Sequence, residues 1–252
     1  TLRPSPAGRL RLMEVVITAS GPRYLRMAER AAATYAAQGL RVTLQVPEGE
    51  PAAGPLRVRR FTWKRPPHAK PHASLKIAGW LAALDALGAV DAGADELVLC
   101  VDADTCCQRR LEVPPSVATA VRGGAIGAAR DRRPGWPTDP ADPWFVEASP
   151  GTDYVNSGVL LLAPACRPTV ERCAELAATD ALLAGQYGDQ RVLNYVLATG
   201  GRQALLPNDW NAIRPRFPAR ARIVHFAGAG GDPESPTRQR DRHARACARV
   251  SR

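Results

Sequence analysis

Two aspartates two positions apart are the residues of this chain best placed to do chemistry. Asp102 and Asp104 follow directly after the apolar run 96–101, which is typical of a central strand covered on both faces. At the carboxyl end of such a strand, carboxylates at positions i and i+2 point together into the ligand crevice of an open α/β sheet. They repel each other unless a divalent cation or an arginine lies between them. The pair therefore indicates a cation site, and the alternative is a solvated acidic turn.

The segments around this pair predict a single mixed α/β domain. A strand over residues 13–19, an Ala-rich helix over 24–38 and an alternating strand over 40–46 form the start of a parallel sheet. A helix capped by Ser74 is expected before the strand at 96–101. The other expected elements are strands at 125–129, 155–162 and 222–226 and a helix at 191–198.

The composition is that of a globular protein with an anionic partner. Of the 252 residues, 45% are hydrophobic and 23% are charged, which suits one large core. No apolar run approaches the roughly 18 residues that a membrane helix needs. The net charge of +10 points to a nucleotide, a phospholipid headgroup or nucleic acid, or else to a solvated basic surface. The six cysteines form no C-x-x-C pair, which argues against a zinc site and favours a reduced, cytoplasmic protein.

Seven short blocks in a fixed order resemble glycosyltransferase family 8, the retaining enzymes that include glycogenin and lipopolysaccharide galactosyltransferases. The blocks lie at residues 15–24, 75–80, 97–105, 153–160, 188–194, 206–211 and 223–228. They are similar to the family's opening strand, its T-K-L-x-x-W segment, its L-Y-L-D-A-D-T strand and its F-N-S-G-V, D-Q-x-x-L-N, L-P-x-x-x-N and I-x-H-F-x-G motifs. The resemblance implies a GT-A fold over residues 1–231, which is a Rossmann-like mixed β-sheet flanked by helices. It also implies retaining transfer of a hexosyl group from a nucleoside-diphosphate sugar, a UDP-sugar, to an acceptor that the sequence does not identify.

The same resemblance implies a role for individual residues. Asp102, Asp104 and His225 would hold Mn²⁺ or Mg²⁺, a cation that suits two carboxylates and an imidazole. The residues implied to bind the donor are Thr18, Ala19, Tyr24, Lys76, Asp102, Asn156, Gly158 and Gly228. Asp189 and Gln190 are implied to be catalytic, because they would lie under the anomeric carbon and stabilise an oxocarbenium-like centre.

Each of these residues also has a plain structural interpretation. His225 fits a buried histidine with satisfied hydrogen bonds, and Lys76 fits a lysine on a helix surface. Residues 156–158 fit a turn. Asp189 fits the first turn of a helix, where a carboxylate complements the helix dipole, and Tyr24 fits a core tyrosine.

The chain departs from the family after residue 228. The family's x-x-K-P-W, whose lysine neutralises the diphosphate, is replaced by A-G-G-D-P at residues 229–233. Diphosphate binding would then rely on the metal, on backbone amides of the glycine run or on an arginine such as Arg238. This leaves open a non-catalytic protein that binds a sugar nucleotide or nucleic acid. A sugar nucleotidyltransferase is a third interpretation, although residues 20–23 lack the glycine-rich basic loop that it needs.

Residues 232–252 are expected to form a basic C-terminal tail. Few of their side chains are large and apolar, so the segment cannot bury enough surface to fold by itself. Six arginines from residue 238 onward, offset by Asp241, predict peripheral docking on an anionic membrane or acceptor. A solvated end without a partner is the alternative, and nucleic acid is not the expected partner.

Overall fold

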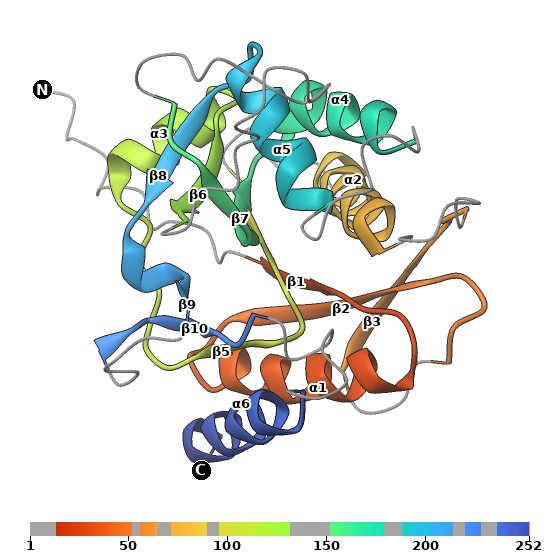
Figure 1. The fold of residues 1–252 in the computed structure, drawn as a ribbon, viewed down its shortest axis with the longest axis vertical. Helices are drawn as coiled ribbons and strands as arrows, with labels where there is room; N and C mark the ends of the chain where they lie inside the picture. Colours follow the sequence, from red (N-terminus) through yellow and green to blue (C-terminus); the bar gives the residue numbers. More distant parts are fainter. Residues whose placement is uncertain are drawn as a thin grey trace, which may run out of the picture.

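The computed structural model describes residues 14–51, 56–64, 72–89, 96–131, 152–178, 188–213, 220–227 and 236–251. Most of the described strands form one mixed sheet between two groups of helices, and a smaller sheet lies beside it (Figure 1). Helices α1 (Pro22–Ala36) and α6 (Pro236–Val250) lie on one side of the main sheet. On the other side lie α2 (His72–Ala89), α4 (Arg167–Ala177) and α5 (Gly188–Ala198). The short helix α3 (Pro115–Arg122) packs near the far edge of the sheet.

The main sheet combines strands from both halves of the chain. In spatial order its described strands are β3 (Arg57–Phe61), β2 (Arg41–Pro47), β1 (Glu14–Thr18), β4 (Val98–Val101), β7 (Val155–Leu162), β6 (Ile126–Arg130) and β8 (Gln203–Leu206). The first four run parallel, whereas β7 runs antiparallel to both of its neighbours. Every residue of β4 and β7 is buried, as expected for central strands covered on both faces.

Helix α2 packs closely on β1 at Gly79. A Cβ atom at this position would lie 2.2 Å from Thr18 Oγ1, so a larger residue could not occupy it without moving the helix. Lys76 precedes Gly79 by three residues and lies on the same face of α2. The close packing therefore fixes Lys76 beside the carboxyl ends of the parallel strands.

The smaller sheet joins two distant parts of the chain. Its described strands are β5 (Thr105–Cys107), β10 (Ile223–His225) and β9 (Ala212–Ile213), in that spatial order. β5 and β10 are antiparallel, with Thr105 opposite His225. Because β5 directly follows the two aspartates, this pairing carries His225 to them.

The C-terminal segment is more ordered than the sequence predicts. Residues 236–250, expected to be part of a polar tail, form helix α6, which packs against α1 and β5 (Figure 1). His243 and Cys247 lie one turn apart and are 0% and 3% exposed. A helix with only a few buried side chains can still pack stably when the rest of the domain provides an apolar surface for them. The apolar content of the segment alone therefore does not predict this packing.

The long elements predicted from the sequence are confirmed. The strands expected at 13–19, 40–46, 96–101, 125–129, 155–162 and 222–226 correspond to β1, β2, β4, β6, β7 and β10, and the expected helices at 24–38 and 191–198 to α1 and α5. Ser74 does not cap α2, because the helix already begins at His72. The strands β3, β5, β8 and β9 were not predicted. All four are short edge strands of their sheets, so they lack the continuous apolar run of a central strand.

The cysteines lie in the interior of the fold. All six cysteines lie within the described residues and are free and buried, and Cys100 and Cys166 belong to the main core. None of the described helices is both long and apolar enough to cross a bilayer.

Candidate active site

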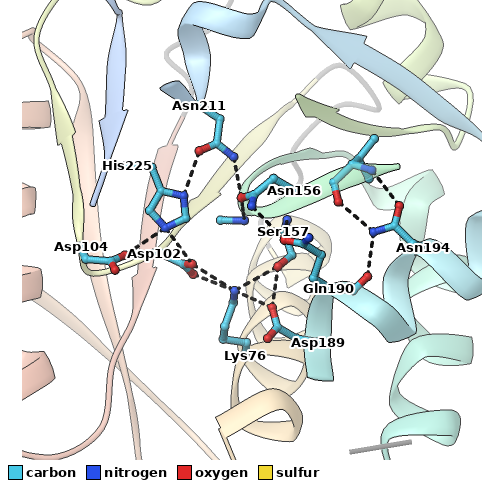
Figure 2. A network of polar contacts seen from close by, with 12 residues as sticks. Lys76, Asp102, Asp104, Asn156, Ser157, Asp189, Gln190, Asn194, Asn211 and His225 are labelled. Atoms are coloured by element: carbon cyan, nitrogen blue, oxygen red, sulfur yellow. Dashed lines mark hydrogen bonds and ion pairs between the residues drawn. The ribbon is translucent and has the colours of Figure 1, made fainter. Parts of the chain in front are cut away.

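Asp102, Asp104 and His225 meet where β4 ends and β5 begins. The His225 Nε2 atom lies 3.2 Å from Asp104 Oδ1 and 3.6 Å from Asp102 Oδ2 (Figure 2). Burial alone would raise the pKa of the Asp104 carboxyl, but His225 holds that pKa below its usual value. Burial likewise opposes the charged form of His225, yet Asp104 and Asp102 raise its pKa. The two aspartates thus create a negative potential that a cation would complement.

These three side chains fit a divalent cation. One ligand atom from each lies within 4.8 Å of the others, and the histidine is 5% exposed while the aspartates keep 15% and 23%. A small octahedral cation holds its ligands at about 2.1 Å, which places neighbouring ligand atoms about 3 Å apart. Small shifts of the side chains bring them to that spacing. Two carboxylates and one imidazole are a donor set for Mn²⁺ or Mg²⁺ and leave coordination positions for other oxygens.

Lys76 connects this cluster to Asp189. Its Nζ atom lies 2.9 Å from Asp102 Oδ1 and 2.6 Å from Asp189 Oδ2 (Figure 2). Burial opposes the charged form of Lys76, but the two aspartates raise its pKa above the ordinary value. For Asp189 burial acts the other way, and Lys76 with the Ser157 hydroxyl holds its pKa below the ordinary value. Lys76 is therefore a half-buried ion-pair partner of both aspartates, unlike a solvated lysine on a helix surface.

Amide side chains continue the network from Gln190 toward β6. The Asn156 Nδ2 atom donates to Gln190 Oε1 at 2.8 Å and to Asp131 Oδ2 at 3.1 Å, and Gln190 Nε2 donates to the same Asp131 oxygen at 3.0 Å. Asn194 holds this corner together, because its side chain forms two hydrogen bonds with the backbone of Val155 in β7. The first turn of α5, with Asp189 and Gln190, is thereby fixed against β7.

Asn211 determines the tautomer of His225. The His225 Nδ1 atom lies 3.0 Å from Asn211 Oδ1, and Asn211 Nδ2 donates to Asn156 Oδ1 at 2.7 Å (Figure 2). With its amide nitrogen directed at Asn156, Asn211 presents an acceptor to the ring, so Nδ1 carries a proton. Nε2 then faces the two aspartates, and a cation bound between them would take the place of a proton on Nε2. This is the arrangement in which a neighbouring group orients a metal-binding histidine.

Gly158 makes room for the same imidazole ring. A Cβ atom on Gly158 would lie 2.2 Å from His225 Cε1 and 2.9 Å from Asn156 Oδ1. Its carbonyl oxygen also accepts a hydrogen bond from Asp102 N at 2.9 Å. The family resemblance implies that this glycine binds the donor; in the structure, the His225 side chain lies against it.

No protein-family model and no curated protein matches the sequence. Among solved structures, the fold matches the galactosyltransferase LgtC in complex with donor and acceptor sugar analogues, with a TM-score of 0.60. The two sequences are 19% identical, and the match covers 94% of this chain and 96% of that chain. The chain has the GT-A fold. The fold class implied by the seven sequence blocks is thus confirmed.

Within this GT-A fold, the remaining expected donor residues lie at the end of β1 and at the start of α1. Tyr24 is half-buried in its first turn; burial raises the pKa of its hydroxyl, and Asp104 and Asp102 act in the same direction. The Thr18 side chain faces Gln45 and Gly79, and Ala19 N donates to Gln45 O at 3.0 Å. Gly228, the glycine run that follows it and the side chain of Arg238 lie outside the described residues.

Four residues of the candidate site had no role in the sequence interpretation. They are Asp131, Ser157, Asn194 and Asn211. Asn194 and Asn211 are the last residues of the D-Q-x-x-L-N and L-P-x-x-x-N blocks, so the motifs marked them without showing what they contact. Asp131 stands alone after β6, and no sequence signal separates it from a surface aspartate.

Proposed function

We propose that the chain is a glycosyltransferase that transfers a hexosyl group from a UDP-sugar to an acceptor in a reaction that depends on Mn²⁺. The observation that carries the proposal is the gathering of Asp102, Asp104 and His225 at the carboxyl edge of a GT-A sheet, with Lys76 and Asp189 beside them (Figure 2). Crevices at this edge are where open α/β sheets bind ligands.

The chemistry of the cluster suits a nucleoside diphosphate as the leaving group. A divalent cation bound there neutralises the diphosphate charge that develops as the sugar departs. Asp102 and Asp104 would hold that cation through oxygen and His225 through Nε2. Lys76 fixes the orientation of Asp102 and keeps Asp189 ionised. With these roles, the diphosphate can be neutralised without the family's lysine, which this sequence lacks after residue 228.

We further propose transfer with retention at the anomeric carbon. A general base works best when its pKa lies near the operating pH. The pKa of Asp189 is instead held below its ordinary value by Lys76, so it is a poor proton acceptor but a stable negative charge. Such a charge can stabilise a developing oxocarbenium-like centre. It is less suited to deprotonating an acceptor hydroxyl, as an inverting reaction requires. We expect an α-linked donor to give an α-linked product, read by NMR, and a β-linked product would contradict this assignment.

A screen of donors tests the activity itself. Purified protein would be melted with UDP-, GDP- and dTDP-sugars, each with and without Mn²⁺, because a ligand that binds the native state raises the melting temperature. The donor with the largest Mn²⁺-dependent shift is then incubated with the enzyme. Release of the nucleoside diphosphate supports a glycosyltransferase. An intact donor indicates a binding protein. With pyrophosphate added, formation of a nucleoside triphosphate and a sugar 1-phosphate indicates a nucleotidyltransferase.

Asn211 offers a test of the metal site. In Asn211→Leu the acceptor for His225 Nδ1 is lost, so the ring is free to turn and to bind its proton on Nε2. We expect the Mn²⁺ dissociation constant to rise by about 10- to 100-fold, the usual cost of removing such a neighbour. Asn211→Asp keeps the acceptor oxygen and should bind Mn²⁺ more tightly than the leucine variant. Equal affinities of Asn211→Leu and the unmodified protein, measured by titration calorimetry, would contradict the role of His225.

The exposed side of α6 supports a peripheral contact with an anionic membrane. Arg242, Arg245 and Arg249 are exposed and share one face of the helix, since they are spaced by three and four residues. Near an anionic bilayer, each basic residue contributes about 1 kcal/mol at low ionic strength. We propose that this face of α6 binds anionic lipids and so holds the enzyme at the membrane that carries its acceptor.

Substitution tests this contact more cleanly than truncation, because deletion would also remove the buried His243 and Cys247. The triple variant with Arg242, Arg245 and Arg249 changed to Gln should bind phosphatidylglycerol vesicles more weakly at low salt. Its hydrolysis of the donor should not change. Equal vesicle binding by the two proteins, or none by the unmodified protein at low salt, would exclude the contact.

A further inference from the structure

His243 of α6 lies directly behind the loop that carries the two aspartates. Its side chain is 0% exposed, and its Nε2 atom lies 3.0 Å from the carbonyl oxygen of Thr105, the residue after Asp104. Its ring also packs edge-on against Phe226, the residue after His225, with ring centroids 5.5 Å apart. One side chain thus contacts the immediate neighbours of two residues of the metal cluster.

Thr105 gathers the hydrogen bonds that shape this loop. Its hydroxyl donates to the Asp102 carbonyl at 2.7 Å and accepts from the Tyr35 hydroxyl of α1 at 3.0 Å. On the other strand, Phe226 N donates to the Asp104 carbonyl at 2.9 Å. The backbone of residues 102–105 is therefore held from α1, from the segment after β10 and, through His243, from α6. Of these three supports, only His243 reaches the Thr105 carbonyl.

The neutral imidazole has one N–H group, and this group donates a hydrogen bond to the Thr105 carbonyl oxygen. Burial lowers the pKa of His243, so the ring is neutral and has one N–H. A carbonyl oxygen can only accept, so the proton lies on Nε2. The Nδ1 atom has no hydrogen-bond partner among the described residues. The Cys247 sulfur, 3.3 Å from the same Nε2 atom, can serve as a second, weaker acceptor.

From these contacts we infer that His243 is a positioning residue for the metal site, and that α6 fixes the backbone of residues 102–105 at the spacing that the cation needs. The inference rests on the proposed metal-dependent function. A loop without this hydrogen bond samples other orientations of Asp102 and Asp104, and the binding of a cation must then restore the productive one. The consequence is weaker metal affinity even when the fold is intact.

A pair of amide substitutions isolates the hydrogen bond. The amide nitrogen of Gln reaches the position of the imidazole Nε2 atom, whereas that of Asn reaches only the position of Nδ1. In His243→Asn we expect the Mn²⁺ dissociation constant, measured by the EPR signal of free Mn²⁺ without any donor, to rise at least about tenfold. In His243→Gln it should return close to the wild-type value. Cys247→Ala is the matched control: it disturbs the same buried face of α6 and removes only the weaker acceptor, while the hydrogen bond to Thr105 stays. It should therefore lower the melting temperature and leave Mn²⁺ binding unchanged.

The outcomes separate this inference from the proposed function. If the unmodified protein does not bind Mn²⁺, the proposed metal site itself is wrong. If it binds Mn²⁺ and His243→Asn binds equally well, His243 is only a packing residue and the inference is overturned. If His243→Asn does not fold, His243→Gln decides: wild-type Mn²⁺ affinity supports the role of the N–H donor, and a tenfold loss in the folded protein overturns it.

Discussion

Replacing Asp104 with Ala should reduce transfer by about 10³-fold or more while the protein stays folded. The carboxylate lies 3.2 Å from His225 Nε2 in a cluster with excess negative charge. Its loss removes one of three cation ligands and with it the stabilisation of the leaving diphosphate, and single electrostatic groups of this kind are worth about 10²–10³-fold in turnover. The variant should also bind Mn²⁺ weakly. Turnover with the donor and the Mn²⁺ affinity would be measured on the same preparation.

Asp85→Ala is the control for this substitution. Asp85 lies on α2 with an exposed side chain, and its ion pair with Arg167 is at the surface. Surface ion pairs contribute about 0–1 kcal/mol to stability, so this variant should have nearly unchanged stability and full activity. An Asp104→Ala variant that is fully active in the presence of excess chelator would refute the metal site.

Gly158→Ala should disturb the metal site through His225 and not through the aspartates. The new Cβ atom would lie 2.2 Å from His225 Cε1, so the imidazole or β7 has to move. Added atoms in a well-packed interior cost about 1–3 kcal/mol of stability. Because His225 also meets Asn211 and the two aspartates, we expect the Mn²⁺ affinity to fall by about 100-fold, at the upper end of losses from a mispositioned ligand. Thermal melting and Mn²⁺ titration would measure the two effects separately.

A second glycine supplies the matched control. Gly88 lies in α2, and a Cβ atom there would meet nothing within 4 Å. Gly88→Ala should therefore stabilise the protein by about 0.5–1 kcal/mol, because alanine is the better helix former. If Gly158→Ala bound Mn²⁺ as tightly as Gly88→Ala, His225 would not be a ligand.

The fold was predictable wherever the chain buries long apolar segments. β4 and the second half of β7, residues 159–162, are apolar runs that indicate central strands, and the D-x-D pair could be placed at the end of β4 from the sequence. By contrast, β5 and β9 have three and two residues. Segments so short form strands only because a partner pairs with them, and the partner of β5 lies far along the chain. Tertiary context, which local propensity does not contain, decided these elements.

The sequence likewise indicated some residues of the candidate site and not others. Asp102 was predicted from its type and its place after an apolar strand, whereas Asp189 and Lys76 were assigned roles through the resemblance to glycosyltransferase family 8. The residues that orient them were not predicted, because an asparagine such as Asn211 gives no sign of its partner until the fold brings His225 within 3.0 Å. For His243 the separation is larger still, since it lies 138 positions after its acceptor Thr105. Because the segment is rich in arginine, nothing in its sequence indicated that His243 and Cys247 are buried.

The pairing of β5 with β10 also has a consequence for the order of folding. Strands β1 to β4, with α1 and α2 between them, come from adjacent stretches of chain and can associate once they are made. The loop of residues 102–105 obtains His225 and His243 only after a much longer stretch has been synthesised and closed. Closing long loops costs entropy before any contact compensates for it, so contacts of this kind form late. On the ribosome the cation-binding cluster should therefore be among the last parts of the molecule to mature, after most of the main sheet has assembled.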